Sequence, residues 1–159
     1  MKPLKTLITL FLIAASAGGI SARAENHLKI SADAACPTAA QMDHRQLQGV
    51  WHTDLPGHGG TTVLRLGQHP ELAGSVRGTL ERAGQTAQVV GDVHQGELTL
   101  EESLDGKRIS ATWLGDVVEG QCGKEIRGQW SENAAADDAL EVSVPFVLRK
   151  QAMPPVVSQ

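Results

Sequence analysis

Histidines, cysteines and paired acids are the side chains of this 159-residue chain that could carry out chemistry. The six histidines are His27, His44, His52, His58, His69 and His94. The chain has no His-x-His, His-x-x-x-His or Cys-x-x-Cys spacing, which are the spacings typical of zinc sites. His52 and His58 flank one loop, and a metal site there is the alternative to solvated loop histidines. We expect no metal and no cofactor.

The acids and the nucleophiles give no catalytic pattern either. The chain has no Gly-x-Ser-x-Gly motif, and Cys36 and Cys122 are expected to be bonded to each other. The pairs Glu101-Glu102 and Asp137-Asp138 would point to opposite faces of an extended strand. General acid and base catalysis needs two such groups close together. We therefore predict that the protein is not an enzyme.

Residues 1–24 resemble a signal peptide. Lys2 and Lys5 precede an apolar run over residues 7–15, and a small-residue cleavage site follows at residues 22–24. The alternative is a membrane anchor, but the apolar run is shorter than the roughly 18 residues that a spanning helix needs. The prediction is a periplasmic or secreted protein.

An exported chain with two cysteines favours one disulfide, Cys36 to Cys122, with buried thiols as the alternative. Removal of the leader removes three basic residues and lowers the formal net charge from −4 to −7. Nucleic acids and anionic membranes attract clustered Lys and Arg, so we expect neither as a partner. A small-molecule ligand or a protein partner remains.

Alternating apolar positions predict eight β-strands, and these divide the chain into an arm at 25–46, a barrel at 47–150 and a flexible tail at 151–159. The expected strands cover residues 47–53, 61–67, 74–82, 86–94, 97–102, 109–117, 126–130 and 142–148. Ala83-Gly84, Gln95-Gly96 and Asp105-Gly106 are typical of tight hairpins. A helical turn is expected over residues 38–44 of the arm.

Short connections make neighbouring strands antiparallel, and eight of them can close without an exposed edge. The predicted fold class is therefore all-β, an eight-stranded antiparallel up-and-down β-barrel with an N-terminal arm and one disulfide. An open meander and a two-sheet sandwich are the alternatives. In the barrel, Cys36 and Cys122 fall at the same end, so the bridge is reachable. The inward set carries no charge, and its five glycines indicate either tight coiling or bulges.

The segment Leu47-Gln48-Gly49-Val50-Trp51 resembles the Gly-x-Trp signature of the lipocalin, fatty-acid-binding and avidin superfamily. Residues 111–115 with Gln129-Trp130 resemble the paired tryptophan strands of avidins, and residues 74–80 resemble their third strand. The resemblance implies that Trp113 and Trp130 line a ligand. The chain departs from avidins at Leu80, where that family has a tyrosine, and at Glu101-Glu102, where it has a tryptophan. Biotin is therefore not the expected ligand.

A second resemblance is to periplasmic inhibitors of metalloproteases, small barrels whose first strand reads Leu-x-Gly-x-Trp. It implies that residues 25–46 could enter a protease cleft.

The sequence thus predicts an exported, non-enzymatic binding protein for a small apolar ligand. The alternative is an inhibitor or immunity-type protein that blocks a hydrolase through its arm or barrel loops. The candidate ligand-binding residues are Trp51, Trp113 and Trp130, with Thr53 and Asp54 at the end of the first strand, and Leu80. The tryptophans could equally be barrel core.

Overall fold

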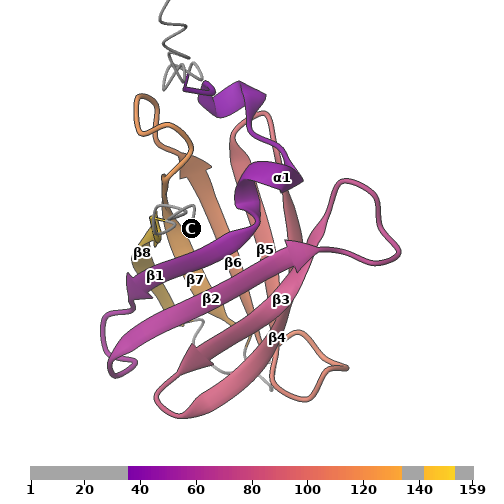
Figure 1. The fold of residues 1–159 in the computed structure, drawn as a ribbon. Coiled ribbons are helices and arrows are strands. Elements are labelled where there is room, and N and C mark those ends of the chain that lie inside the picture. Colours follow the sequence, from indigo (N-terminus) through magenta and orange to yellow (C-terminus); the bar gives the residue numbers. More distant parts are fainter. Residues whose placement is uncertain (1–35, 134–141, 153–159) are drawn as a thin grey trace, which may run out of the picture. The chain divides into compact units, whose positions relative to one another are not determined.

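The computed structural model describes residues 36–133 and 142–152 (Figure 1). The predicted signal peptide, the first part of the arm with His27, the acids Asp137-Asp138 and most of the predicted tail lie outside the described residues. Within the described part, no helix is both long enough and apolar enough to cross a membrane.

Eight antiparallel strands form a closed barrel in the order of the sequence, as predicted. A short 3₁₀ turn, η1 (Ala39–Gln41), and one short helix, α1 (His44–Leu47), precede them. The strands are β1 (Gly49–Asp54), β2 (Thr61–Gln68), β3 (Val76–Arg82), β4 (Gln85–His94), β5 (Glu97–Ser103), β6 (Ala111–Val117), β7 (Glu125–Glu132) and β8 (Val142–Lys150).

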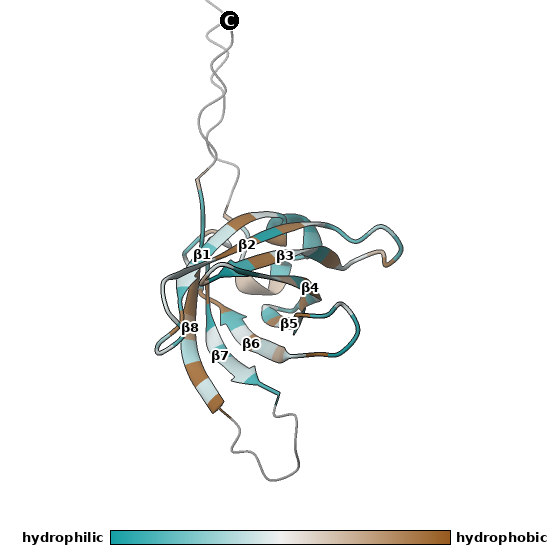
Figure 2. Ribbon diagram, turned by 90° about the horizontal axis from the view of Figure 1, so that it is seen from below, coloured by the Kyte–Doolittle hydropathy of each residue, from teal (hydrophilic) through white to brown (hydrophobic). Residues whose placement is uncertain are grey.

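The alternation that predicted the strands also sets the two faces of the barrel wall. Apolar residues of one parity point inward and fill the interior, and Figure 2 shows the alternating hydropathy along β8. The largest of these fully buried side chains include Trp51, Trp113, Trp130, Leu64, Leu80 and Leu98. The three tryptophans are therefore the largest members of the buried core.

Two of the three predicted hairpins are two-residue turns. Ala83-Gly84 joins β3 to β4 and Gln95-Gly96 joins β4 to β5, and all four residues have positive φ. This backbone twist matches the twist of the flanking strands. The prediction at Asp105-Gly106 was wrong, because β5 and β6 are joined by a longer loop, residues 104–110.

Three other expectations need correction. Leu47 was placed in the first strand but ends α1, and its buried side chain belongs to the hydrophobic core. Ile109 was placed inward on the sixth strand but is exposed in the loop before β6. Val142 was placed inward but is exposed, because it lies at the very start of β8.

Four of the five inward glycines, Gly78, Gly91, Gly115 and Gly128, mark close approach between strands and not bulges. Each pairs one to one with a residue on the neighbouring strand, as Gly78 does with Leu66 on β2 and Val89 on β4. A Cβ on Gly78 would overlap the carbonyl oxygen of Arg65. The wall of the barrel coils too tightly there for any side chain.

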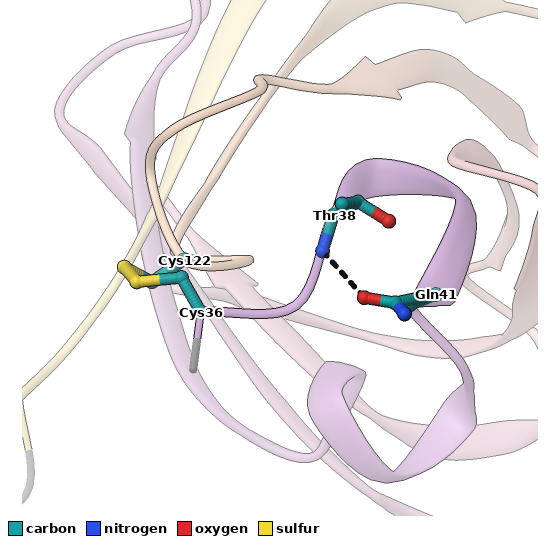
Figure 3. The surroundings of a disulfide bond; sticks show 4 residues. All are labelled: Cys36, Thr38, Gln41 and Cys122. Atoms are coloured by element: carbon teal, nitrogen blue, oxygen red, sulfur yellow. Dashed lines mark hydrogen bonds between the residues drawn. A yellow bond between two sulfur atoms is a disulfide. The ribbon is translucent and has the colours of Figure 1, made fainter. Parts of the chain in front are cut away.

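One end of the barrel, called the sealed end below, is closed by residues 36–47. Cys36 and Cys122 form the predicted disulfide there, with their Cα atoms 4.4 Å apart (Figure 3). Thr38 N–H donates to Gln41 Oε1 at 3.0 Å within the turn that follows. Met42 is buried in the core. Residues 36–46, the second half of the predicted arm, are therefore part of the folded domain.

The opposite end, called the loop end, carries the β1–β2 loop at 55–60, the turn at 83–84, the β5–β6 loop at 104–110, the end of β7 and the start of β8. The barrel closes where β1 meets β8, through the pairs Trp51 with Lys150 and His52 with Arg149. Every other ladder pairs at least six residues. This seam is the shortest contact in the barrel wall.

Candidate binding site at the loop end of the barrel

A charged pair lies inside the barrel near the loop end. Glu102 on β5 shares the inward parity of Leu98 and Leu100 and is only 1% exposed. Arg82, the last residue of β3, shares the parity of Leu80. The expectation of an uncharged inward set was therefore wrong. The inward parity continues to the end of each strand and there places a charged residue inside the barrel.

The carboxylate of Glu102 is held by three residues on three other strands. Its Oε1 accepts from Arg82 Nη2 at 2.9 Å. Its Oε2 accepts the indole N–H of Trp113 at 3.2 Å and that of Trp130 at 3.1 Å. These contacts satisfy the buried charge and both buried indole groups, as groups in a low dielectric require.

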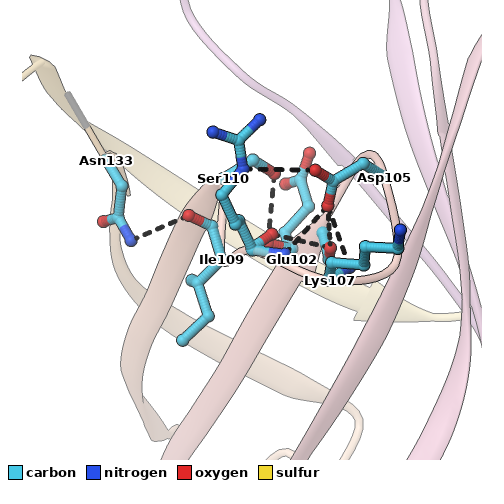
Figure 4. A network of polar contacts seen from close by, with 8 residues as sticks. Glu102, Asp105, Lys107, Ile109, Ser110 and Asn133 are labelled. Carbon is cyan, nitrogen blue, oxygen red and sulfur yellow. Dashed lines mark hydrogen bonds and ion pairs between the residues drawn. The ribbon is translucent and has the colours of Figure 1, made fainter. Parts of the chain in front are cut away.

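The β5–β6 loop is tied to the same residue through its backbone. The carbonyl oxygen of Glu102 accepts from the Ser110 N–H at 2.7 Å and from the Ser110 hydroxyl at 3.1 Å (Figure 4). Asn133 Nδ2 donates to the carbonyl oxygen of Ile109 at 3.3 Å. The start of β6 and the end of β7 are therefore positioned by the strand that carries the buried carboxylate.

Aromatic and cationic groups surround Trp130. The imidazole of His58, from the β1–β2 loop, meets the Trp130 ring edge-on, with centroids 4.5 Å apart and an interplanar angle of 65°. The guanidinium of Arg82 lies 5.0 Å from the centre of the same ring. Trp113 packs in turn against Phe146, with centroids 5.1 Å apart. Trp130 is therefore covered by groups from two different loop-end segments.

Two threonines bring unpaired hydroxyl groups to the same end. Thr53 on β1 and Thr62 on β2 are register partners, and both side chains point inward. Thr53 is 5% exposed and Thr62 is 0% exposed. Among the described residues, neither Oγ1 finds a hydrogen-bond partner. Such buried, unpaired polar atoms are uncommon in folded proteins.

The structure separates the predicted ligand-binding residues into groups. Trp113, Trp130 and Thr53 lie near the loop end. Trp51 lies toward the sealed end, where its indole N–H donates to the carbonyl oxygen of Leu47 at 2.7 Å. The side chain of Leu80 points inward from β3 and is buried in the core, and Asp54 is exposed.

Four residues of the site were not among the predicted ones: Arg82, Glu102, Thr62 and His58. The parity of the flanking residues was a usable signal for the first three, because each extends an apolar alternation by one step. No sequence signal indicated that His58 would contact Trp130.

A depression of about 440 Å³ adjoins the site on the rim of the loop end. The β5–β6 loop and the end of β7 line it with Leu104, Asp105, Arg108, Ile109, Ser110, Glu132 and Asn133. The backbone N–H groups of Arg108 and Lys107 donate to Asp105 and hold the pKa of its carboxyl at about 2. Asp105 thus stays charged and orders the loop (Figure 4).

The histidines do not gather in the folded part of the chain. His69 Nδ1 accepts two backbone N–H groups in its own turn, and His52 contacts Gln151 on the outer face. Within residues 36–133 and 142–152, no three His, Cys, Asp or Glu side chains are grouped in a way that could hold a metal ion. Glu101 and Glu102 do point to opposite faces of β5, as predicted.

No family model matches the chain, and no curated protein matches it. The closed eight-stranded antiparallel barrel agrees with the architecture that the lipocalin and avidin resemblance implied.

Proposed function

We propose that the chain is an exported, non-enzymatic binding protein that takes a small ligand at the loop end of its barrel. One observation carries the proposal: the buried hydroxyl groups of Thr53 and Thr62 lie side by side without a partner among the described residues. The indole and guanidinium donors nearby are already paired with Glu102.

An unpaired buried hydroxyl costs about 1–3 kcal/mol of stability. A ligand that presents a hydrogen-bonding group to β1 and β2 would remove this cost on binding. The rings of Trp113 and Trp130 lie at the same end but are 0% and 2% exposed, so a ligand meets them only where a covering side chain moves aside. Arg82 with Glu102 supplies charge. These neighbours favour a flat ligand with one polar edge over a wholly apolar one.

The test is to replace each hydroxyl by a methyl group of the same size, in Thr53→Val and Thr62→Val. The free protein should become more stable by about 1 kcal/mol per change, because an unpaired polar atom is removed. Binding of a flat amide or heterocyclic fragment, followed through the indole N–H resonances of Trp113 and Trp130, should weaken about tenfold.

Thr79→Val on the outer face of β3 is the matched control and should change neither quantity. A loss of stability in the inward variants would mean that the hydroxyls are already paired, and the proposal would fall.

A hydrolase inhibitor is the second candidate, and one observation favours it. Leu104 and Ile109 are exposed beside the rim depression, where a protein partner could dock. Because the disulfide fixes Cys36, only residues before it could reach far into a cleft. Deleting residues 25–34 should abolish inhibition of a secreted metalloprotease if the arm acts, whereas Leu104→Ser with Ile109→Ser should abolish it if the loops act.

A further inference from the structure

The side chain of His58 lies on the aromatic surface that the proposed ligand needs. Its imidazole meets the ring of Trp130 edge-on, with a centroid distance of 4.5 Å. Its backbone N–H donates to the carbonyl oxygen of Leu55 at 3.1 Å, which closes a turn over residues 55–58. The contact is thus made by a loop residue and not by the wall of the barrel.

Apart from these two contacts of His58, the tip of this loop is loosely packed. Gly57 and Gly59 flank His58 with φ of +80° and +64°, values that other residues rarely adopt. A Cβ on Gly57 would meet nothing within 4 Å, and one on Gly59 would meet only Ala83, at 4.0 Å. Leu55 at the base of the loop is buried and anchors it. Residues 57–60 therefore have open space beside them, while Leu55 holds the base of the loop in the core.

We infer that the imidazole of His58 occupies a ring-binding subsite on Trp130 and is displaced by a planar nitrogen heterocycle. The inference rests on the proposed function and specifies its ligand class. The imidazole of His58 is a flat five-membered ring with hydrogen-bonding nitrogens. The space that it fills beside Trp130 therefore has the size and chemistry of a small nitrogen heterocycle. The loop acts as an internal competitor that a ligand must move.

The neighbours of Trp130 restrict what the subsite can recognise. The indole N–H of Trp130 already donates to Glu102, so a ligand could contact only the ring face of Trp130. Arg82, 5.0 Å from the same ring, adds a planar guanidinium that stacks on flat groups. Its side chain is 12% exposed, compared with 1% for Glu102, so the arginine is the member of the pair that lies closer to solvent. Saturated rings lack the flat face that both groups favour.

The experiment uses imidazole as the probe and His58→Ala as the variant. Removal of the side chain should let imidazole bind with a dissociation constant on the order of 1 mM, read from the Trp130 indole N–H resonance. The wild-type protein should bind it more weakly, by up to about tenfold, because an edge-on aromatic contact must first be broken. Pyrrolidine, which is saturated, should bind neither protein.

His52→Ala is the matched control, because His52 lies on the same strand-and-loop unit but contacts Gln151 on the outer face. It should bind imidazole as the wild type does. In the wild-type protein, deuterated imidazole should move the His58 ring protons from their ring-current-shifted positions toward those of an exposed histidine. This second readout needs no variant and still decides the question if His58→Ala does not fold.

Equal imidazole binding by the wild type and His58→Ala, or none by either, would overturn the ring subsite. So would an unchanged His58 resonance at saturating imidazole. These outcomes are distinct from failure of the proposed function, which is decided by whether Thr53→Val and Thr62→Val stabilise the protein.

Discussion

Glu102 and Arg82 form an ion pair inside the barrel, although they lie on β5 and β3, two strands that are not neighbours. β4 lies between them, so both side chains meet above its inward face. The carboxylate also receives the indole groups of Trp113 and Trp130. This one residue therefore links four of the eight strands.

We expect Arg82→Met to destabilise the protein by about 3–5 kcal/mol, because it leaves a buried carboxylate without its counter-charge. Glu102→Gln should cost less, since an amide oxygen still accepts from the indoles and Arg82 can turn toward solvent. Urea unfolding measures both. The double variant should cost less than the two single changes added together, and strict additivity would show that the pair is not coupled.

Loss of the disulfide should be the largest single effect at the sealed end. Cys36→Ser opens a link between residues 86 apart in the sequence, worth about 4.6 kcal/mol in the chain-entropy model. The melting temperature should fall, and the Cys122 thiol should become reactive. Mass spectrometry of the non-reduced wild-type protein provides the check, and two titratable thiols there would contradict the bridge.

Gly78→Ala should destabilise the barrel by about 1–3 kcal/mol, because the new methyl group overlaps the carbonyl oxygen of Arg65. Gly67→Ala on the neighbouring strand is the control. A Cβ there would lie 3.8 Å from the nearest carbonyl oxygen, an ordinary contact. Thermal unfolding should separate the two variants by several degrees, and similar melting temperatures would show that the wall has room at Gly78.

Asp43 should contribute to the acid sensitivity of the sealed end. The side chain and backbone of Arg45 hold the pKa of Asp43 at about 2, below its ordinary value of 3.8. Because the folded state favours the charged carboxylate, its stabilisation is complete above pH 3.8 and is lost as the pH falls through about 2. Asp43→Asn should therefore flatten this part of the stability curve.

Asparagine also caps helices well, so Asp43→Asn should cost little at pH 7, whereas Asp43→Ala should cost about 1 kcal/mol. Urea unfolding at pH 7 and pH 2.5 tests both variants. An unchanged acid slope in Asp43→Asn would assign the acid sensitivity to other carboxyl groups.

The period-2 alternation predicted all eight strands, because each strand has one face in a core and one in solvent. The short connections predicted their antiparallel order, and the closed barrel, with an open meander and a sandwich as alternatives, is confirmed. The disulfide was predicted from the presence of two cysteines in an exported chain, and the barrel topology agreed with it. Helix α1 was missed, although Asp43 and Gln46 form a capping box that the sequence displays. The hydrophobic Leu47 was instead assigned to the strand that begins two residues later.

The binding site was predictable only in part. The tryptophans were recognisable by type and parity, but the pairing of Glu102 with Arg82 depends on the register of three strands at once. Both residues continue an inward alternation. Charged side chains are usually exposed, so the alternation was not extended to them. The His58 contact depends on how a glycine-rich loop folds back, which no periodicity encodes.

The short seam between β1 and β8 gives the barrel a preferred place to open. Two residue pairs close it, supported by hydrogen bonds from Gln151 N–H to the carbonyl oxygen of Val50 and from Lys150 Nζ to that of Gln46. Amide protons along this seam should therefore exchange with solvent before those of β3 to β6. A barrel opened there would present two unpaired strand edges, and the edge of one molecule could pair with the edge of the next. Heating or mild denaturant would therefore yield linear assemblies before full unfolding.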